Sequence, residues 1–262
     1  LEISHARHVL KRANPEFDAL LRALRDAQAQ NAWLIVTETD DHEIIDVRPS
    51  AQPPEPREAR RRSVLGDLWR WLKWLLRCLS YRCVKPHKAE QMFNLVSAQS
   101  CDPTTVPPPC IPFLYPDDGC WARAHEMCRL MIAAGVTPRK VWIFGSLYVP
   151  TRNNPACHVG WGWHVAPTLC IRHRFFGPSE ENVIDPSLFP APVSTLTWKG
   201  VQGDPNAQLK HTDASVYFHP SLPFLPKTDP TYTQTAQDLS FYRLLLKNRS
   251  LQFGPPPYAN CP

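Results

Sequence analysis

Proline is the residue that most constrains how this chain can fold. It occupies 29 of the 262 positions, against ten glycines, which is roughly twice the ordinary share of about 5%. Because proline lacks a backbone N–H and fixes its φ angle, it interrupts helices and central strands. We therefore expect short regular elements joined by extended segments. The hydrophobic content of 43% still indicates a globular protein.

A small folded unit is predicted before the first proline-rich segment. The spacing of apolar residues predicts a helix over 15–30, and the segment 32–48 reads as a β-hairpin. Together they form a small α+β unit over residues 1–48, which is marginally stable by itself. The segment 49–58, PSAQPPEPRE, predicts an extended and exposed linker.

The segment 63–79 has the pattern of an amphipathic helix. Six leucines share one face, three tryptophans widen that face, and arginine, lysine and aspartate lie opposite. A basic, tryptophan-rich helix of this kind is typical of a membrane surface. The interpretation we favour is a helix that packs on the following domain, since most amphipathic helices face a protein core.

The positive charge of the chain is local. The net charge is +5, but residues 57–88 alone carry ten basic and two acidic residues. A nucleic-acid-binding protein usually has a broad basic face, so no nucleic-acid partner is expected. No run of about 18 apolar residues occurs, so no membrane-spanning helix is expected either.

Nine cysteines suggest an oxidising compartment. Four disulfides and one free thiol would account for them. A reduced protein with buried thiols is the competing interpretation. No CxxC pair occurs, which argues against a ribbon-type zinc site. A zinc site formed by Cys157, His158 and His164 is the weakest of these alternatives, and no metal is expected.

The composition changes near residue 89, and we treat residues 89–262 as a second domain of the α+β class. Helices, a proline-rich loop and apolar strands follow one another in it. The predicted elements are a helix at 89–99, a loop at 102–116, a helix at 120–134 ended by Gly135, strands at 141–149, 160–171 and 182–189, and a short helix near 236–248.

Three residues of this domain have the order of a thiol-enzyme triad. Cys120 opens a predicted helix, where the positive end of the helix dipole favours a thiolate. His164 lies in an apolar strand, and Asp185 comes where Pro186 stops the next strand. Such a histidine deprotonates the thiol, and such an aspartate fixes the imidazole tautomer. A buried or bridged cysteine, a core histidine and an Asp-Pro turn explain the same residues without chemistry, and spacing alone leaves both possibilities open.

Several motifs, in order, resemble the secreted bacterial protein-glutaminases, also called protein glutamine deamidases. The resemblance covers residues 89–262. Its motifs are AEQMFNLVSAQSCDPTTVPPPCIPFLYPDDGCWARAHEM from residue 89, FGSL at 144–147, GWGWHVA at 160–166, VIDPSLF at 183–189 and, more loosely, PVSTLTW at 192–198 and SVYFHPS at 215–221.

This resemblance implies a papain- and transglutaminase-like α+β core. It implies that Cys120 is the nucleophile, His164 the base and Asp185 the residue that orients the base. The implied reaction is hydrolysis of the side-chain amide of glutamine in proteins or peptides, with no metal or organic cofactor. The chain departs from the family where Cys157 is followed by His158 instead of a second cysteine, which leaves the disulfide pattern there open.

The resemblance also suggests roles for neighbouring residues. Trp161 and Trp163 are candidates to wall the substrate's glutamine stem, although core packing is the better explanation for at least one of them. Arg123 and His125 match the family motif and are assigned to structural support. We expect Glu126 at the surface. Cys101 and Cys110 match the family and are close enough in sequence to form a local disulfide.

Residues 1–88 occupy the place of the family's pro-region, which covers the active site. The unit 1–48 and the segment 49–88 would then pack against the catalytic domain and restrain it. The alternative is a toxin-like effector in which this region delivers the enzyme or contacts membrane through residues 63–79. A transglutaminase or a cysteine protease would use the same triad. The implied location is outside the bacterial cytoplasm, by secretion or translocation.

Overall fold

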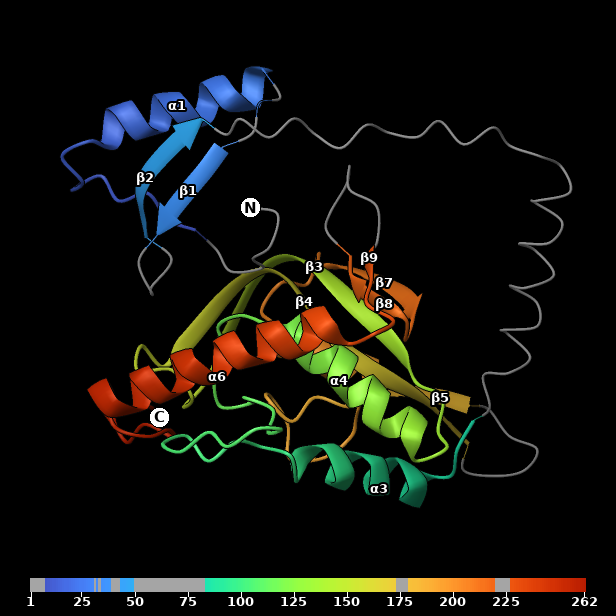
Figure 1. The fold of residues 1–262 in the computed structure, drawn as a ribbon. Coiled ribbons are helices and arrows are strands. Elements are labelled where there is room, and N and C mark those ends of the chain that lie inside the picture. Colours follow the sequence, from blue (N-terminus) through green and yellow to red (C-terminus); the bar gives the residue numbers. More distant parts are fainter. Residues whose placement is uncertain are drawn as a thin grey trace, which may run out of the picture. The chain divides into compact units, whose positions relative to one another are not determined.

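The computed structural model describes residues 8–30, 32, 34–38, 43–49, 83–172, 179–219 and 227–262. The predicted helix 63–79, and the predicted linker after Pro49, lie outside the described residues. The chain divides into two compact units, one containing the elements up to Pro49 and one containing those from Cys83 onward. Each unit is described by itself (Figure 1).

The first unit is a helix packed on a β-hairpin. Its elements are α1 (Phe17–Gln30), β1 (Leu34–Glu38) and β2 (Ile44–Pro49). The two strands pair antiparallel, with Leu34 opposite Pro49 and Thr37 opposite Asp46. Leu20 of α1 and Ile44 of β2 are buried. The helix and the hairpin predicted from the sequence are confirmed.

The second unit is built on a five-stranded antiparallel sheet with the order β6-β5-β4-β3-β7. Four helices and a two-stranded ribbon complete it. Its elements are α3 (Pro86–Ser97), α4 (Cys120–Ala133), β3 (Arg139–Pro150), β4 (His158–Arg172), β5 (Ser179–Val183), β6 (Val193–Ser194), α5 (Thr195–Gly200), β7 (Gln208–Asp213), β8 (Val216–Phe218), β9 (Lys227–Thr228) and α6 (Thr233–Phe253).

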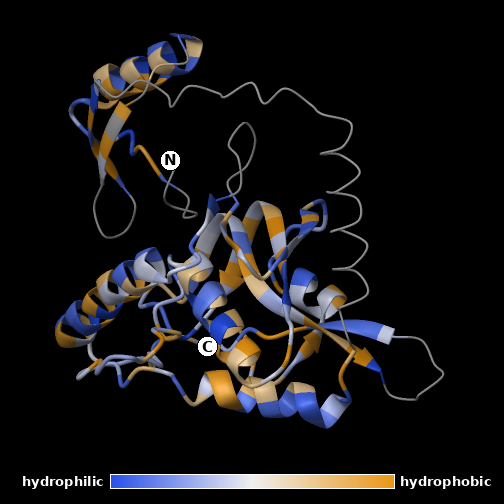
Figure 2. Cartoon of the chain, turned by 45° about the vertical axis from the view of Figure 1, so that its right-hand side comes forward, coloured by the Kyte–Doolittle hydropathy of each residue, from blue (hydrophilic) through white to orange (hydrophobic). Residues whose placement is uncertain are grey.

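The sheet separates two hydrophobic cores. The helices α3, α4 and α6 gather on one side of the sheet, where α4 packs on β4 and is flanked by the other two (Figure 1). A second core, centred on Val141, Leu147 and Trp198, fills the other side, where α5 packs on β5. The strands that form both cores are among the hydrophobic segments of Figure 2. This arrangement confirms the α+β class.

The sheet is strongly curled. His211 on β7 and Glu181 on β5 are joined by a contact of 2.6 Å between Nε2 and Oε2, although two strands lie between them. In a flat sheet, strands three positions apart lie about 14 Å from each other. The curl therefore brings the two edges of the sheet toward one another around the second core.

The helix α4 is buried on almost all sides. Ten of its 14 residues are buried, because the sheet, α3 and α6 all pack on it. It begins after Gly119, whose φ of 75° lies in the left-handed region, and it ends just before Gly135, with a φ of 77°. Glycine tolerates this conformation at both helix boundaries. The predicted helix 120–134 and its end at Gly135 are confirmed.

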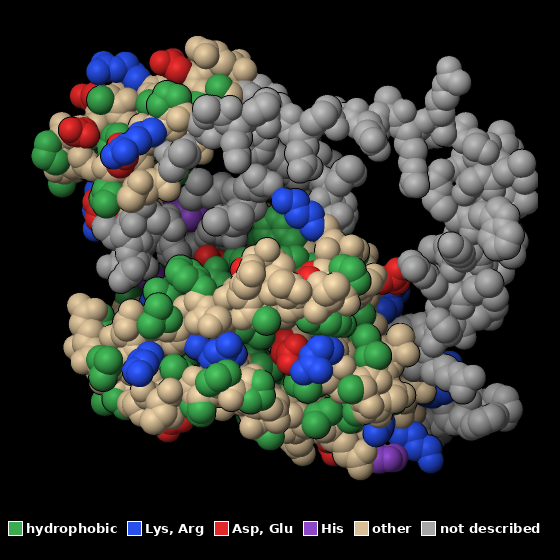
Figure 3. All heavy atoms as spheres, in the orientation of Figure 1, with side chains coloured by type: hydrophobic (Ala, Val, Ile, Leu, Met, Phe, Trp, Pro, Cys, Tyr) green, Lys and Arg blue, Asp and Glu red, His purple; other side chains and the backbone are tan. Residues whose placement is uncertain are grey.

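Two predicted elements differ from the structure. The strand expected over 182–189 ends at Val183, because the backbone turns at Asp185, whose carbonyl accepts the N–H groups of Leu188 and Phe189. The helix expected near 236–248 is α6, which extends over 21 residues to Phe253. Polar residues interrupt the apolar pattern of α6, so the helix predicted from the sequence was shorter than the one observed. Figure 3 shows hydrophobic side chains scattered among polar ones over the face that carries α6.

Three disulfides join segments of the second unit. The predicted Cys101–Cys110 disulfide is confirmed. Cys83 pairs with Cys170, and Cys157 pairs with Cys261. Cys120 and Cys128 are free thiols, and Cys78 lies outside the described residues. The expected four disulfides with one free thiol therefore do not hold, since two buried thiols stay reduced.

Residues 83–88 belong to the second unit. Besides the disulfide of Cys83, Val84 forms a bridge with Ile171 beside β4, and α3 begins at Pro86. The boundary expected at residue 89 therefore shifts to a position before Cys83. Within the described ranges, no helix is both long enough and apolar enough to cross a membrane.

Candidate active site

Cys120 is the first residue of α4 and is 1% exposed. The first N–H groups of a helix have no partner within it, and together with the helix dipole they favour negative charge. Gly119 precedes the thiol and packs so closely on the Tyr242 ring of α6 that an added Cβ would collide with it. The tight turn at residue 119 is therefore fixed by both backbone conformation and packing.

The loop before Cys120 is fixed by Arg123, one helical turn into α4. Its guanidinium Nη1 donates to the carbonyl of Tyr115 at 2.9 Å and to that of Asp118 at 2.5 Å. Arg123 is 2% exposed. It supports the loop, in agreement with the role assigned from the sequence.

His164 and Asp185 form a buried pair. His164 Nε2 lies 2.9 Å from Asp185 Oδ2, and the two residues are 1% and 2% exposed. The indole of Trp198 also donates to Oδ2 at 2.9 Å, and the backbone N–H of Ser187 donates to Oδ1 at 3.2 Å. Burial alone would raise the pKa of Asp185, but His164 and the other donors outweigh it and hold this pKa below its usual value. The carboxylate is therefore ionised, and Nε2 of His164 carries the proton.

Two tryptophans stack on the imidazole. The ring of Trp161 stacks on His164 with centroids 4.4 Å apart and planes inclined by 13°. The ring of Trp198 also stacks on His164, at 5.6 Å and 27°. The register of the β3–β4 pair shifts between Phe144 and Leu147, and near this irregularity Trp161 and His164 come to share one face of β4. With two indoles stacked on a ring that is 1% exposed, the orientation of His164 is fixed.

The thiol of Cys120 lies against the strand that carries His164. The backbone amide of Val165 hydrogen-bonds Cys120. This part of β4 is paired with β3, but its pairing with β5 begins only at Thr168, so α4 meets an unpaired stretch of the strand edge. The structure therefore brings Cys120 to the strand of His164 and pairs His164 with Asp185.

Several charges act on the thiol. Burial raises the pKa of Cys120, and the negative charges of Asp118 and Asp185 raise it further. Arg123 and the amide of Val165 oppose this shift. Formation of the thiolate therefore depends on a proton acceptor close by, which is the part that a neighbouring imidazole takes in thiol enzymes.

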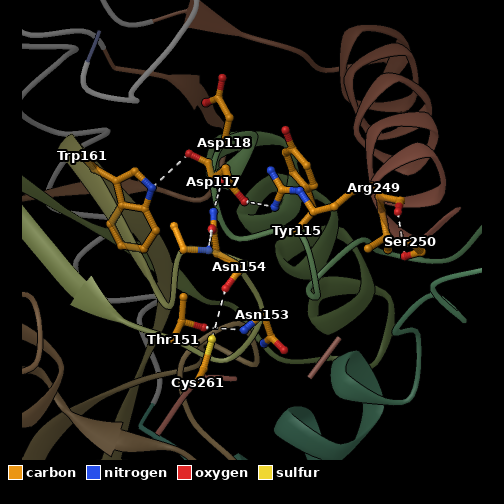
Figure 4. Close-up of polar contacts among 12 residues, drawn as sticks. Tyr115, Asp117, Asp118, Thr151, Asn153, Asn154, Trp161, Arg249, Ser250 and Cys261 are labelled. Atoms are coloured by element: carbon orange, nitrogen blue, oxygen red, sulfur yellow. Dashed lines mark hydrogen bonds and ion pairs between the residues drawn. The ribbon is translucent and has the colours of Figure 1, made fainter. Parts of the chain in front are cut away.

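A polar network anchors the same loop from α6 (Figure 4). Arg249 Nη1 donates to Asp117 Oδ2 at 2.5 Å, and the guanidinium lies 4.2 Å above the Tyr115 ring. Asn154 donates to the other oxygen of Asp117 at 2.5 Å. The carbonyl of Asp117 accepts the indole N–H of Trp161 at 3.0 Å. Asp117 therefore links the loop before Cys120 to the tryptophan that stacks on His164.

The two tryptophans proposed as substrate contacts lie in different places. Trp161 is fully buried and supports His164, while Trp163 is 7% exposed and packs against Trp121, Trp142 and Phe218. Their contact with a glutamine stem stays a prediction. The packing interpretation that the sequence left open describes both of them.

The expectation that Glu126 lies at the surface is wrong. Glu126 is 8% exposed and is held by two hydrogen bonds from Arg129, at 2.8 and 2.6 Å. The polar face of α4 is covered along with the apolar face. The i,i+3 spacing lets Arg129 neutralise the buried carboxylate.

A second buried group lies farther along α4. His125 Nδ1 lies 2.9 Å from the ammonium of Lys140, and Nε2 lies 3.2 Å from the carbonyl of Asp229. Lys140 is fully buried and also donates to the carbonyl of Val216. Burial and the positive charge of Lys140 lower the pKa of His125 to about 4. This network ties β3, α4 and β8 to the segment before α6, as expected for a supporting role.

The sequence did not reveal several of these residues. No sequence pattern predicts a place in the site for these residues, although one of them ends a looser family motif. They are Trp198, which ends that motif, and Asp117, Asp118, Tyr242 and Lys140. Among the described residues, no group of three or more histidines, cysteines or carboxylates has the arrangement of a metal site. Cys157 is bonded to Cys261, so it is not a zinc ligand beside His158.

Comparison with known proteins points to the protein-glutaminases. A family model described as glutaminase matches residues 89–202. The structure of a mutant of pro-protein-glutaminase superposes with a TM-score of 0.68 and 25% identity, over 93% of this chain and 86% of that one. Pro-protein-glutaminase itself gives the same TM-score over all of this chain and 91% of that one, at 24% identity.

The structure of protein-glutaminase from Chryseobacterium proteolyticum is 29% identical, with a TM-score of 0.55, over 69% of this chain and 97% of that one. Residues 89–202 therefore resemble the glutaminase family, and the fold resembles that of the protein-glutaminases. Among curated proteins, no relative matches it. The matched structures of the pro-forms cover more of this chain than the structure of the enzyme from Chryseobacterium proteolyticum does. The fold is therefore the papain- and transglutaminase-like one expected from the sequence.

Proposed function

We propose that this chain is the precursor of a hydrolase that converts protein-bound glutamine to glutamate and releases ammonia. The observation that carries the proposal is the buried 2.9 Å contact between His164 and Asp185, next to the strand edge on which Cys120 rests. The match to the glutaminase family model and the likeness to protein-glutaminase structures support the substrate class. Cys120, His164 and Asp185 are the proposed nucleophile, base and orienting carboxylate.

The first half of the reaction forms a thioester. Because Asp185 holds Nε2 of His164, Nδ1 is the atom that takes the proton from Cys120. The thiolate attacks the carboxamide carbon of glutamine, and the negative charge moves to the oxygen. An N–H group at the start of α4, such as that of Cys120, stabilises this oxyanion. The protonated His164 then gives its proton to the nitrogen, the C–N bond breaks and ammonia leaves.

The second half of the reaction hydrolyses the thioester. Neutral His164 takes a proton from water through Nδ1, and the resulting hydroxide adds to the acyl carbon. The C–S bond then breaks, the thiol of Cys120 is restored and glutamate remains in the substrate protein. Asp185 stays ionised throughout and stabilises the imidazolium of each step.

The region before Cys83 is proposed to restrain the enzyme. The pro-protein-glutaminase structures match nearly all of this chain, which supports a pro-region in the first unit and the following segment. The three disulfides support folding in an oxidising compartment outside the cytoplasm. The proposed partners are substrate proteins with accessible glutamine and, inside the chain, the pro-region against the catalytic unit.

An ammonia-release assay on a glutamine-containing peptide tests the function. We expect little release from the intact chain and strong release after limited proteolysis between residues 50 and 80, which leaves Cys83 and its disulfide in place. Cys120→Ala, treated with the same protease, is expected to release none. Full activity of that variant, or equal activity before and after cleavage, would contradict the nucleophile and the restraint, respectively.

Three competing activities are separated in the same reaction. A cysteine protease would cut the peptide, and a transglutaminase would incorporate an added primary amine. Mass spectrometry of the peptide distinguishes them, since deamidation alone adds about 1 Da without a new terminus. A toxin-like effector would be a deamidase that is active with the first unit attached.

A further inference from the structure

Glu181 on β5 is a partly buried carboxylate, and the mechanism above gives it no part. Its Oε2 lies 2.6 Å from Nε2 of His211 on β7. Its Oε1 accepts the hydroxyl of Thr168 at 2.9 Å, and Oε2 accepts that of Thr195 at 3.2 Å. Thr195 also donates to the backbone carbonyl of Glu181 at 3.2 Å. One residue of β5 therefore joins β4, β7 and the first residue of α5.

These contacts hold the carboxylate in one orientation. Thr168 is fully buried, so its hydroxyl cannot turn to solvent instead. Burial by itself would raise the pKa of Glu181, but His211 and the threonine hydroxyls outweigh it and hold this pKa below its usual value. The side chain is therefore ionised, and each of its oxygens has a donor from a different element.

Thr195 is important because of the residue that α5 carries one turn later. Trp198 is fully buried, and it is the indole that stacks on His164 and donates to Asp185. Trp198 is the buried residue of α5, whereas Leu196 beside Thr195 is 81% exposed. The strand β6, which leads into α5, pairs with β5 through two residues. A helix anchored by so few residues depends on the bond from Thr195 to Glu181 for its position.

We propose that Glu181 is a positioning residue of the active site, which holds the start of α5 through Thr195 and thereby places Trp198. This inference rests on the proposed function. His211 fixes the carboxylate by pairing with it across the curled sheet. When α5 is displaced, Asp185 loses a donor that stabilises its charge, and the imidazole that it orients is less well placed for proton transfer.

Replacement of Thr195 is the most specific test, since valine keeps the shape of the side chain and removes the hydroxyl. In the protease-treated chain acting on a glutamine peptide, we expect kcat of Thr195→Val to fall by about tenfold with KM nearly unchanged. Thr195→Ser keeps the hydroxyl and should retain most of the wild-type kcat. An unchanged kcat in Thr195→Val, or equal losses in the two variants, would overturn the proposal.

The carboxylate itself is tested by Glu181→Gln. The amide has one acceptor oxygen in place of two, so it cannot serve both threonines and His211 together, and kcat should fall as in Thr195→Val. The double variant Glu181→Gln/Thr195→Val should lose little more than either single variant, because both disturb the same contact. Losses that multiply would contradict a common route.

The matched control is Glu90→Gln, which removes an exposed carboxylate of α3. It should leave kcat and KM at their wild-type values. A loss as large as that of Glu181→Gln would show that the assay responds to net charge, and it would overturn the role given to Glu181.

A pH profile separates positioning from a smaller amount of folded enzyme. The mechanism needs Asp185 ionised, so loss of the Trp198 donor should move the acid limb of kcat/KM to higher pH by about half a unit in Thr195→Val. The charged groups that act on Asp185 are His164 on β4 and Arg123 on α4, and this variant changes neither. Less folded enzyme would lower every rate equally, so an acid limb that stays in place overturns the proposal.

A spectroscopic measurement on the intact chain works without turnover. The Nε2 proton of His164 lies in the 2.9 Å contact with Asp185. Histidine labelled with the heavy nitrogen isotope makes this proton observable by NMR, and His164→Gln assigns its signal. We expect the signal to shift in Thr195→Val and to keep its wild-type position in Thr195→Ser.

The two proposals can fail separately. If the protease-treated wild type releases no ammonia from the glutamine peptide, the proposed function fails. The NMR measurement still decides whether Thr195 and Glu181 place the donor on Asp185, since an unchanged His164 signal in both Thr195→Val and Glu181→Gln overturns that inference by itself.

Discussion

At the scale of single residues, one carboxylate organises the histidine of the site. Asp185 accepts hydrogen bonds from His164, Trp198 and the backbone of Ser187. These donors fix its rotamer, and it in turn fixes the tautomer and ring plane of His164. The sequence proposed His164 and Asp185 because their type and order are characteristic of thiol enzymes, and the structure pairs the two side chains. It did not identify Trp198, since tryptophans at core positions look alike in a sequence.

Replacement of Asp185 by asparagine tests this tautomer control. The amide keeps the size of the side chain, but only its oxygen accepts hydrogen bonds, so it cannot serve the donors on both Oδ1 and Oδ2, and it has no charge to stabilise an imidazolium. We expect kcat to fall by at least about 100-fold with little change in KM. Circular dichroism and thermal unfolding should match the wild type within a few degrees. Retention of more than a tenth of wild-type kcat would contradict the assigned role.

The buried position of His125 leads us to expect that the stability of the fold decreases at acidic pH. Its pKa is lowered to about 4, whereas a histidine in an unfolded chain titrates near 6.5. Between these values the unfolded state binds a proton that the folded state does not, so the free energy of unfolding should decrease as the pH falls from about 6.5 to 4. Above pH 6.5 this contribution is fully present. Urea unfolding at pH 7.0, 5.5 and 4.5 measures it.

The variant His125→Gln removes the titrating group and should flatten part of this dependence, although it is less stable at pH 7. His87→Gln is the matched control, because His87 is exposed on α3. That variant should keep the wild-type slope. The same slope in His125→Gln and the wild type would show that other groups cause the acid sensitivity.

At the scale of elements, the sequence pattern predicted the helix and strand boundaries that depend on neighbouring residues in the chain. The start of α4 after Gly119 and its end before Gly135 follow from glycine's backbone freedom, and the hairpin and strands follow from apolar alternation. The burial of Glu126 and the length of α6 do not follow from such local patterns. Both depend on which elements pack together, and a residue such as Glu126 looks solvent-exposed until the elements that pack on α4 are in place.

The contact between α6 and the loop before Cys120 gives an element-scale prediction. Arg249 and Asp117 form an ion pair whose side chains are each 9% exposed. Arg249→Met leaves a buried carboxylate without its cation, which should destabilise the fold by about 3 kcal/mol. Activity should also fall, since Asp117 carries the acceptor for Trp161. Chemical denaturation and ammonia release measure the two effects.

A double variant shows whether the unpaired charge is the cause. Asp117→Asn combined with Arg249→Met removes both charges and should recover part of the lost stability. Lys247→Met changes an exposed cation of the same helix and should have little effect. A double variant less stable than Arg249→Met alone would place the effect in side-chain packing on Tyr115 instead.

At the scale of the whole molecule, disulfides connect segments that the sequence keeps far apart. Cys101–Cys110 was predictable because both residues lie in one short loop. Cys83–Cys170 spans 87 positions and Cys157–Cys261 spans 104. Nothing local links such partners, since only the sheet order brings the end of β4 to the start of α3 and the end of the chain to the β3–β4 turn. The catalytic unit accordingly begins earlier than composition suggested.

The Cys83–Cys170 disulfide predicts how far the chain can be shortened. A chain that begins at Cys83 keeps the disulfide and the bridge of Val84 to Ile171, whereas one that begins at Ala89 loses both. In the chain-entropy description, closing a loop of this length stabilises the fold by roughly 4 to 5 kcal/mol. We therefore expect the Ala89 chain to unfold at a temperature at least about 10 °C lower, and to expose one more alkylatable thiol, that of Cys170.

The double variant Cys83→Ser/Cys170→Ser in the Cys83 chain separates the effect of the disulfide from that of the removed residues. It should reproduce the part of the lower melting temperature that comes from the disulfide, and the remainder belongs to the first residues of α3. Equal melting temperatures of the Cys83 and Ala89 chains under non-reducing conditions would show that the disulfide does not hold the catalytic unit together, and would return its boundary to residue 89.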